Sequence, residues 1–470
     1  MGRQNRRKSI FLKNIEIIDT ANKGRSIAKH EGRVVFVNGG VPGDICDITI
    51  FKRRKKFWQA KIDKIHTYSK RRTDPKCEHF GTCGGCKWQN MNYKSQLEFK
   101  QNEVLNNLKR IGDIKLPKNF EIIGSKDDYF YRNKMEFTFS NKRWLSLEEI
   151  QSEAEIKEKN ALGFHIPGMF DKVIDLKNCY LQKEPSNSIR LSIKKFTLKH
   201  KITYFDIRNH SGLLRNLMIR TSSTNDLMVL IQFYEKNIKE IKLIMDHIKH
   251  TFPEVTSLLY IINQKANNTI YDQEVICYHG KDHIIEEIDG LYFKIGAKSF
   301  FQTNSEQAKT LYRKTKELAA IAKNNIVYDL YTGTGTIAQY VATNAKKVIG
   351  IDSVKEGILA ANENAKRNNI TNCRFFTGDM KEIFTDEFIA TNGSPDVIIT
   401  DPPRDGMHKK VIEQILKIRA LRIVYVSCNS STQARDISLM KKIYKTIHIQ
   451  PIDMFPQTHH TENIVVLELK

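Results

Sequence analysis

The chain has 470 residues, of which 40% are hydrophobic, and a formal net charge of +23. This length predicts two to four domains, and the composition excludes both a disordered chain and a disulfide scaffold. The sequence has no run of 18 apolar residues and no apolar signal stretch near its start, so we expect neither a membrane span nor secretion and place the protein in the cytoplasm.

The positive charge is concentrated in the first sixth of the chain. Residues 1–76 hold 20 Lys and Arg against 7 Asp and Glu. Such a block favours a nucleic-acid partner over a merely solubilising surface, where both signs would be mixed. Within it, short β-prone runs separated by turns predict a small closed barrel over residues 1–70. The run Lys52-Arg-Arg-Lys-Lys56 falls between the last two strands, where a hairpin tip would reach phosphates.

A crowded cysteine motif follows the barrel. Cys77, Cys83 and Cys86 have the spacing C-x5-C-x2-C, with two glycines between the last pair, and this pattern favours metal ligation. Three thiolates do not complete a site. Cys179 is the strongest candidate for the fourth because it follows a turn-like Lys-Asn pair. All-sulfur ligation suits either zinc or an iron–sulfur cluster, and the spacing leaves that choice open.

Residues 71–285 are predicted to form a mixed α+β middle domain that carries this cysteine motif. A helix is expected at about 92–111, with an apolar face that packs on a neighbouring part, the C-terminal domain being the candidate. Strand-like runs follow, with helices near 184–197 and 235–251. Residues 144–160 are acidic and lysine-rich with few apolar side chains, so we expect an exposed insertion there.

Strands and helices alternate regularly in residues 286–470, which predicts a parallel, doubly wound α/β sheet of the Rossmann type. The first strand, 326–330, runs into a turn containing Gly333 and Gly335, and Asp352 closes the second strand. A glycine turn followed by a carboxylate at this distance indicates an adenosine-containing cofactor. The turn Asp401-Pro-Pro-Arg404 after the fourth strand is typical of S-adenosylmethionine (SAM) methyltransferases.

A cysteine ends the next strand of this series. Residues 423–427 are rich in β-forming residues and run directly into Cys428. A lone cysteine in this position is more often a small buried core residue than a nucleophile. Taken alone, the strand therefore does not indicate catalysis.

Several motifs together resemble the RNA uracil-5-methyltransferase family. They are Tyr131-Arg-Asn-Lys-Met-Glu-Phe137, Arg208-Asn-His-Ser-Gly212, Ser299-Phe-Phe-Gln302, Asp401-Pro-Pro-Arg404, Ser427-Cys-Asn429 and Met454-Phe-Pro-Gln-Thr-His-His-Thr-Glu462. The N-terminal segment resembles a TRAM domain, an RNA-binding barrel. With the cysteine motif, the resemblance spans nearly the whole chain. It is closest to the branch that methylates 23S ribosomal RNA and carries both a TRAM domain and an iron–sulfur cluster.

The resemblance implies SAM-dependent methylation of uracil C5, most closely in 23S rRNA, with tRNA as the alternative substrate. It makes Cys428 the nucleophile that adds to C6 and Glu462 the base that removes the C5 proton. The implied SAM contacts are Gln302, Tyr331, Gly333, Gly335, Asp352, Asp379 and Asp401. The implied 4Fe–4S ligands are Cys77, Cys83, Cys86 and Cys179.

Ser430 stands where the family usually has proline, so it is the first place to look for an effect on the nucleophile's turn and its activation. Phe300 and Phe301 are expected in the core, with stacking of one of them on a flipped-out base as the alternative. His459 and His460 are expected to be polar loop residues rather than metal ligands.

Two other functions compete with uracil methylation. Asp-Pro-Pro turns also serve amino-group methylation, which needs no thiol. A ribosome-assembly or RNA-binding factor with a structural cluster would need no chemistry at all. We infer no protein partner from the sequence and take a monomer as the default.

Overall fold

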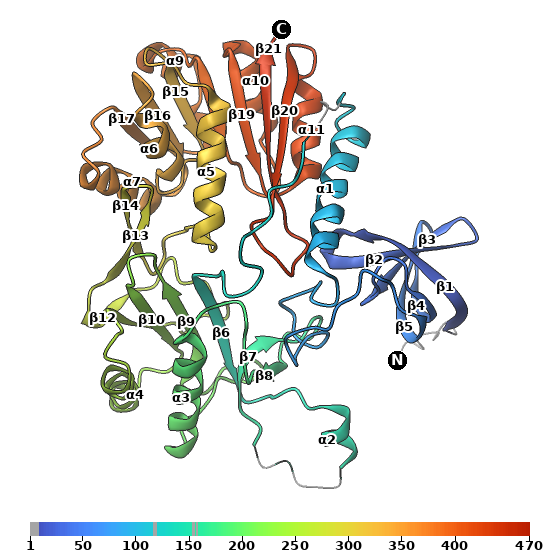
Figure 1. The fold of residues 1–470 in the computed structure, drawn as a ribbon. Helices are drawn as coiled ribbons and strands as arrows, with labels where there is room; N and C mark the ends of the chain where they lie inside the picture. Colours follow the sequence, from blue (N-terminus) through green and yellow to red (C-terminus); the bar gives the residue numbers. More distant parts are fainter. Residues whose placement is uncertain (1–8, 116–119, 153–155, 157) are drawn as a thin grey trace, which may run out of the picture.

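The computed structural model describes residues 9–115, 120–152, 156 and 158–470. Three parts follow one another along the chain: a β-barrel, a mixed middle sheet and a C-terminal α/β sheet (Figure 1). No helix in these described ranges is long and apolar enough to cross a membrane. This architecture confirms the predicted barrel and the mixed α/β sheets.

The barrel is closed by pairing between its first strand and its fourth. The strands run in the order β1 (Ile10–Ala21), β2 (Arg25–His30), β3 (Arg33–Asn38), β5 (Phe57–Thr67) and β4 (Ile45–Arg53). Alternate residues such as Ile17, Val35 and Ile48 point inward and are buried, as the two-residue period of a strand requires. The basic run Lys52–Lys56 lies at the tip of the β4–β5 hairpin, as predicted.

A long helix, α1 (Tyr93–Arg110), lies beside the C-terminal sheet, and the barrel adjoins its amino end (Figure 1). The Asn92 side chain caps it by accepting a hydrogen bond from the Ser95 N–H. Val104 and Leu108 are buried in the core of the C-terminal part, and the helix contacts α11 (Ser430–Met440) and β20 (Tyr444–Ile452). The helix therefore belongs by packing to a part that begins almost two hundred residues later.

The middle sheet has seven strands and is largely antiparallel. Its order is β12 (Ile276–Gly280), β11 (Ser257–Ile262), β10 (Leu227–Phe233), β9 (Leu214–Thr221), β6 (Lys134–Ser140), β7 (Ala161–His165) and β8 (Val173–Asp175). Helices α3 (Ser186–Lys199) and α4 (Ile238–Thr251) pack their apolar residues on this sheet. The short helix α2 (Leu147–Gln151) lies in the predicted insertion, of which residues 153–155 and 157 fall outside the described ranges.

The hairpin of β13 (His283–Ile288) and β14 (Leu291–Gly296) connects the middle sheet to the C-terminal sheet. The boundary placed at residues 285 and 286 falls inside β13. The division into residues 1–70, 71–285 and 286–470 stays a prediction.

The C-terminal sheet has the doubly wound order predicted from the alternating pattern. Its strands are β17 (Cys373–Thr377), β16 (Lys347–Asp352), β15 (Ile326–Leu330), β18 (Val397–Thr400), β19 (Arg422–Ser427), β21 (Glu462–Leu469) and β20 (Tyr444–Ile452), in that order. The helices beside it are α5 (Ser305–Ala319), α6 (Thr336–Ala342), α7 (Lys355–Arg367), α8 (Met380–Ile383), α9 (Asp386–Asn392), α10 (Lys409–Ile418) and α11. The first five strands are parallel and β21 is antiparallel.

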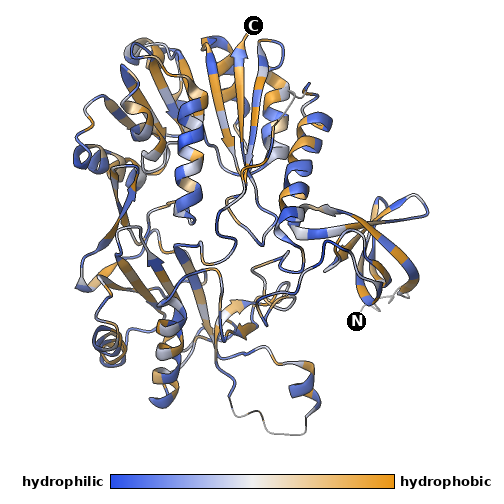
Figure 2. Cartoon of the chain, viewed as in Figure 1, coloured by the Kyte–Doolittle hydropathy of each residue, from blue (hydrophilic) through white to orange (hydrophobic). Residues whose placement is uncertain are grey.

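Because helices cover both faces, the central strands β15, β18 and β19 are almost continuously hydrophobic (Figure 2). The chain runs outward from β15 through β16 to β17 and then returns to the other side of β15 as β18. Such a reversal opens a crevice at the carboxyl ends of the strands. A ligand site is therefore expected beside the ends of β15 and β18.

Candidate active site

The carboxyl edge of the C-terminal sheet gathers most of the predicted site residues. Tyr331, Asp401 and Cys428 directly follow β15, β18 and β19, and Asp352 ends β16. Glu462 is the first residue of the antiparallel strand β21, which places it at the same edge beside the end of β19. Residues separated by as many as 131 positions in sequence are thus presented at one crevice because parallel strands end together.

The glycine turn after β15 is tied to the end of β16. The Gly333 N–H donates to Asp352 Oδ2 at 2.8 Å, and the Val354 N–H donates to Asp352 Oδ1 at 2.8 Å. Gly335 has φ +74°, and a Cβ there would lie 2.8 Å from the Ala361 Cβ and 2.9 Å from the Phe375 ring. Only glycine therefore fits at position 335. The Asp352 carboxylate accepts two backbone hydrogen bonds and still has lone pairs free to accept from ribose hydroxyls.

Two other predicted SAM contacts flank this turn. Asp379 caps α8 and pairs with Lys381. Burial raises the pKa of Tyr331 to about 12, and the nearby carboxylates of Asp436, Asp379 and Asp352 act in the same direction. Tyr331, Asp352 and Asp379 therefore share one electrostatic environment. Gln302 lies before α5, and its carbonyl accepts a hydrogen bond from the Asn133 amide at 2.9 Å.

Cys428, Glu462 and Asp401 also act on one another. Burial, followed by the charges of Glu462 and Asp401, raises the pKa of the Cys428 thiol to about 11. Burial and Asp401 raise the pKa of Glu462 well above its ordinary value, and burial raises that of Asp401 as well. In the protein alone, the thiol is therefore protonated at neutral pH.

Arg404 is the positive group in this cluster. Its guanidinium donates a hydrogen bond to Cys428 and lowers the pKa of the thiol, opposing the two carboxylates. It also lowers the pKa of Glu462. The backbone fixes this arrangement, because the Arg404 carbonyl accepts from Asn429 Nδ2 at 2.9 Å and from the Thr432 hydroxyl at 3.0 Å. The loop after β18 is thereby fastened to the turn that carries the thiol.

Sequence reasoning did not assign Arg404 this role, although the residue stands in the quoted Asp-Pro-Pro-Arg motif. It pointed instead to Ser430, which the structure places as the first residue of α11, with Asn429 as the helix cap. The Ser430 hydroxyl accepts from Asn107 Nδ2 of α1 at 2.9 Å. The Ser430 side chain therefore bonds to helix α1 and not to the Cys428 thiol.

Two buried groups behind the site were also not predicted. Burial raises the pKa of Asp329 to about 7, and its Oδ1 is buried without a hydrogen-bond partner. Burial, with the nearby charges of Asp401, Asp329 and Glu462, raises the pKa of Tyr312. Asp329 is the last residue but one of β15, the strand that leads into the glycine turn, and this position was the one sign of it in the sequence.

Two phenylalanines and two histidines of the neighbouring loops differ in their exposure to solvent. Phe301 is 3% exposed and packs near Phe293, whereas Phe300 is 70% exposed. Burial lowers the pKa of His459 to about 3 and that of His460 to about 4. Both rings are neutral at physiological pH.

The four cysteines of the predicted cluster line one cavity. Cys77, Cys83 and Cys86 come from the loop before α1, and Cys179 comes from the loop before α3. Burial raises the pKa of Cys86 to about 12, and the other three thiols act on it in the same direction. Within the described ranges, no group of three or more His, Cys, Asp or Glu side chains is arranged to hold a metal ion.

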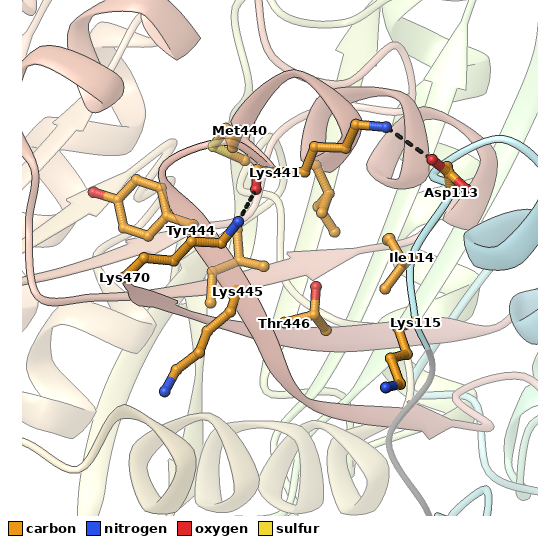
Figure 3. A pocket seen from close by; sticks show the side chains of 11 residues that line it. Asp113, Ile114, Lys115, Met440, Lys441, Tyr444, Lys445, Thr446 and Lys470 are labelled. Atoms are coloured by element: carbon orange, nitrogen blue, oxygen red, sulfur yellow. Dashed lines mark hydrogen bonds and ion pairs between the residues drawn. The ribbon is translucent and has the colours of Figure 1, made fainter.

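A second cavity, of about 510 Å³, lies at the opposite edge of the C-terminal sheet (Figure 3). It is lined by the end of α11, the start of β20 and the end of β21. Two of its lysines have partners nearby: Lys441 pairs with Asp113 at 2.9 Å, and Lys470 Nζ donates to the Lys441 carbonyl at 2.6 Å. Cys428 and Glu462 lie at the other ends of their strands, so this cavity is separate from the candidate active site.

These features define a class I SAM methyltransferase: a doubly wound sheet, a glycine turn, a carboxylate placed to bind the ribose, and an Asp-Pro-Pro turn. A family model described as tRNA (uracil-5-)-methyltransferase matches residues 207–470. An uncharacterized RNA methyltransferase of Bacteroides thetaiotaomicron is 50% identical over 453 residues, which cover 96% of this chain and 100% of that protein. One of Porphyromonas gingivalis is 48% identical over 460 residues, covering 96% and 99% of the two chains.

The structural comparison agrees. The crystal structure of the Pyrococcus abyssi tRNA (uracil-54, C5)-methyltransferase in complex with S-adenosyl-L-homocysteine has a TM-score of 0.74 and 27% sequence identity. The match covers 96% of this chain and 100% of that one. The chain belongs to the tRNA (uracil-5-)-methyltransferase family, and it is a SAM-dependent RNA (uracil-C5)-methyltransferase.

Proposed function

We propose that the enzyme methylates uracil C5 through a covalent bond between Cys428 and C6 of the base. The thiolate sulfur adds to C6, and the ring electrons move onto C5 and O4 as an enolate. C5 then attacks the methyl group of SAM, whose sulfur leaves with the bonding pair. Glu462 takes the C5 proton, the C5–C6 double bond re-forms, and the Cys428 thiolate is expelled.

The observation that carries this proposal is the convergence of Cys428, Glu462, Asp401 and Arg404 at one crevice. A base that accepts a proton from carbon works best with a pKa near the operating pH. Burial raises the pKa of the Glu462 carboxyl above its ordinary value, which is the direction such a base needs, and the neighbouring arginine favours its ionised form. Arg404 also stabilises the thiolate that must form.

SAM fits this environment by charge. Asp329, Asp401 and Glu462 are carboxyl groups whose pKa values are raised chiefly by burial. A sulfonium cation bound among them would favour their ionised forms and would also lower the pKa of Cys428. We therefore propose the predicted contacts for SAM: Gln302, Tyr331, Gly333, Gly335, Asp352, Asp379 and Asp401.

We further propose that Cys77, Cys83, Cys86 and Cys179 hold a 4Fe–4S cluster. The supporting observation is that all four thiols line one cavity. All-sulfur ligation suits zinc as well as an iron–sulfur cluster, so the choice of iron rests on the resemblance to the rRNA branch. Bound there, the cluster would supply a rigid link between the loops before α1 and α3.

For the RNA, we propose a structured substrate, with 23S rRNA first. The support is the basic barrel with its Lys52–Lys56 hairpin and the four-cysteine cavity, which together resemble the rRNA branch. A tRNA substrate is the second candidate. The Pyrococcus abyssi enzyme, which acts on tRNA, matches 96% of this chain, so overall architecture does not separate the two.

Phe300 is the proposed stacking partner for the flipped-out uracil. Its ring is 70% exposed two residues before Gln302, while Phe301 is in the core. Base–aromatic stacking is worth about 1–3 kcal/mol per base. Phe300→Ala should therefore weaken RNA binding or turnover roughly 5- to 100-fold, and Phe300→Tyr should retain most of the function.

Mapping 5-methyluridine in total RNA from cells with and without the gene tests the proposal. The expected result is loss of the modification at one or two rRNA positions, with return on expression of the wild type but not of Cys428→Ala. Loss at a tRNA position instead would select the second candidate. Return of 5-methyluridine on expression of Cys428→Ala would contradict the mechanism, because the thiol would then not be needed. An unchanged 5-methyluridine map together with loss of an N-methylated base would favour amino-group methylation, which needs no thiol.

A further inference from the structure

Residues 453–457, hereafter the anchor segment, begin the loop between β20 and β21. β20 ends at Ile452, which pairs across the ladder with Glu462, the first residue of β21. Asp453 therefore adjoins the strand partner of the proposed base. Whatever fixes the anchor segment also fixes the end of the hairpin from which Glu462 projects.

Helix α1 holds this segment with a buried ion pair. Lys100 Nζ donates to Asp453 Oδ1 at 2.6 Å and to the Phe455 carbonyl at 3.1 Å, and the Tyr93 hydroxyl donates to Asp453 Oδ2 at 3.0 Å. The side chains of Lys100 and Asp453 are both 0% exposed. A buried ion pair is rarely the most stable way to fill a core, but its directional bonds fix one geometry. The pair is thus better suited to positioning than to stability.

A second pair from the same helix binds the other end of the anchor segment. Gln96 Nε2 donates to Gln457 Oε1 at 3.0 Å, and the Gln457 N–H donates back to Gln96 Oε1 at 3.0 Å. Gln457 has a positive φ of 66°, a conformation that few side chains adopt without support. Two successive turns of α1 therefore hold the two ends of the segment.

The anchor segment also meets two other parts of the protein. Asn304 and Gln307, at the start of α5, donate to the carbonyls of Met454 at 3.0 Å and Asp453 at 2.7 Å. The Gln457 carbonyl accepts from the N–H groups of Lys87 and Trp88, which follow Cys86 directly. The turn of Cys428, in contrast, is bonded to Ser427, Arg404 and Thr432. The nucleophile and the base thus share the β19–β21 ladder, in which Ser427 pairs with Asn463, but the loops beside them have different supports.

We propose that Lys100 and Gln96 of α1 are positioning residues for proton abstraction, because they fix the anchor segment and through it the carboxyl group of Glu462. This inference rests on the proposed role of Glu462. Since the base acts only after methyl transfer, loss of these contacts slows elimination while addition of Cys428 and methyl transfer continue. The signature is a methylated covalent protein–RNA adduct that accumulates during turnover.

The test variant is the double substitution Lys100→Met with Asp453→Asn. It removes both charges together, so no unpaired charge is left in the core. In single-turnover reactions with radiolabelled SAM and undermodified RNA, we expect methyl transfer near the wild-type rate. We expect release of product to be about 10- to 100-fold slower, as displacement of a reacting group by about 1 Å costs this much, with labelled adduct visible on denaturing gels.

Leu108→Ala is the matched control. Leu108 lies on the same helix and is buried in the C-terminal core, away from the anchor segment. It should lower the melting temperature and slow both steps alike, without adduct. If the double variant does not fold, Gln96→Met provides the same test at the other end of the segment.

Glu462→Gln, measured in parallel, separates the two claims. If Glu462→Gln accumulates adduct while both the double variant and Gln96→Met behave like Leu108→Ala, the positioning role is wrong and the proposed function stands. If Glu462→Gln forms methylated product without delay, the role of the base itself is wrong, and the positioning proposal falls with it.

Discussion

Burial raises the pKa of Cys428 and of the cavity cysteines alike, but the charged groups around the two sites differ. Burial is the main reason that the pKa of Cys428 rises to about 11, that of Cys179 to about 11 and that of Cys86 to about 12. The cavity cysteines chiefly face one another, whereas Cys428 faces two carboxyl groups and one arginine. A raised pKa therefore does not separate a nucleophile from a metal ligand, but the surrounding groups do.

Each group needs a positive partner to become thiolate. For the cavity cysteines, a bound metal centre would provide it. For Cys428, the partners are Arg404 and the sulfonium that the site is proposed to bind. The two sites should therefore respond to different perturbations, and substitutions can separate them.

The largest expected effect is that of Cys428→Ala. Removing a covalent nucleophile should lower kcat on the order of 10⁴-fold or more. The visible absorption and the melting temperature of the anaerobically purified protein should stay close to those of the wild type. If Cys428→Ala kept substantial uracil methylation, Cys428 would not be the nucleophile, and it would no longer differ in function from the cavity cysteines.

Cys86→Ala should give the opposite pattern. We expect loss of the brown colour and of its broad visible absorption, with a fall in melting temperature of roughly 10 °C. Absorption spectra and thermal unfolding of the anaerobic protein check this, with Cys277→Ala as a control at an exposed cysteine outside the cavity. A colourless wild type that contains zinc would show that the iron assignment is wrong.

A smaller effect is expected at Arg404. A pKa of about 11 means that the Cys428 thiol is mostly protonated below that pH, so its alkylation by iodoacetamide should accelerate about tenfold per pH unit from pH 7 to 9. Arg404→Met raises the pKa further and should lower the rate about 10- to 100-fold across this range, the worth of one charged hydrogen bond.

Arg404→Lys keeps the positive charge and should lose less. Peptide mass spectrometry can follow Cys428 separately from the other cysteines. Equal alkylation rates for wild type and Arg404→Met at every pH would mean that the arginine does not act on the thiol.

The elements of the site were predictable where local pattern decides them. Alternating strands and helices predict a parallel sheet, and such a sheet brings Asp352, Asp401 and Cys428 to one edge whatever the loops do. Closure of the barrel followed equally from its short strands and turns. The identity of the thiol's neighbours did not follow, because Arg404 is exposed and its orientation depends on bonds made by the Asn429 and Thr432 side chains.

The support of Glu462 was beyond sequence reasoning for a different reason. Lys100 and Asp453 are 353 residues apart, and nothing in the sequence pairs them, although the helix was expected to pack on the C-terminal domain. A lysine on an amphipathic helix normally lies in water. Only the docking of α1 on the C-terminal sheet makes it part of a core.

The reaction of Glu462→Gln with SAM and undermodified RNA tests the central claim most directly. If Cys428 adds to C6 and Glu462 removes the C5 proton, the variant transfers the methyl group and then stalls. Denaturing gels should show a protein–RNA adduct that carries the label from SAM and is absent from Cys428→Ala. Methylated RNA released at the wild-type rate, with no adduct at any time, would contradict the account.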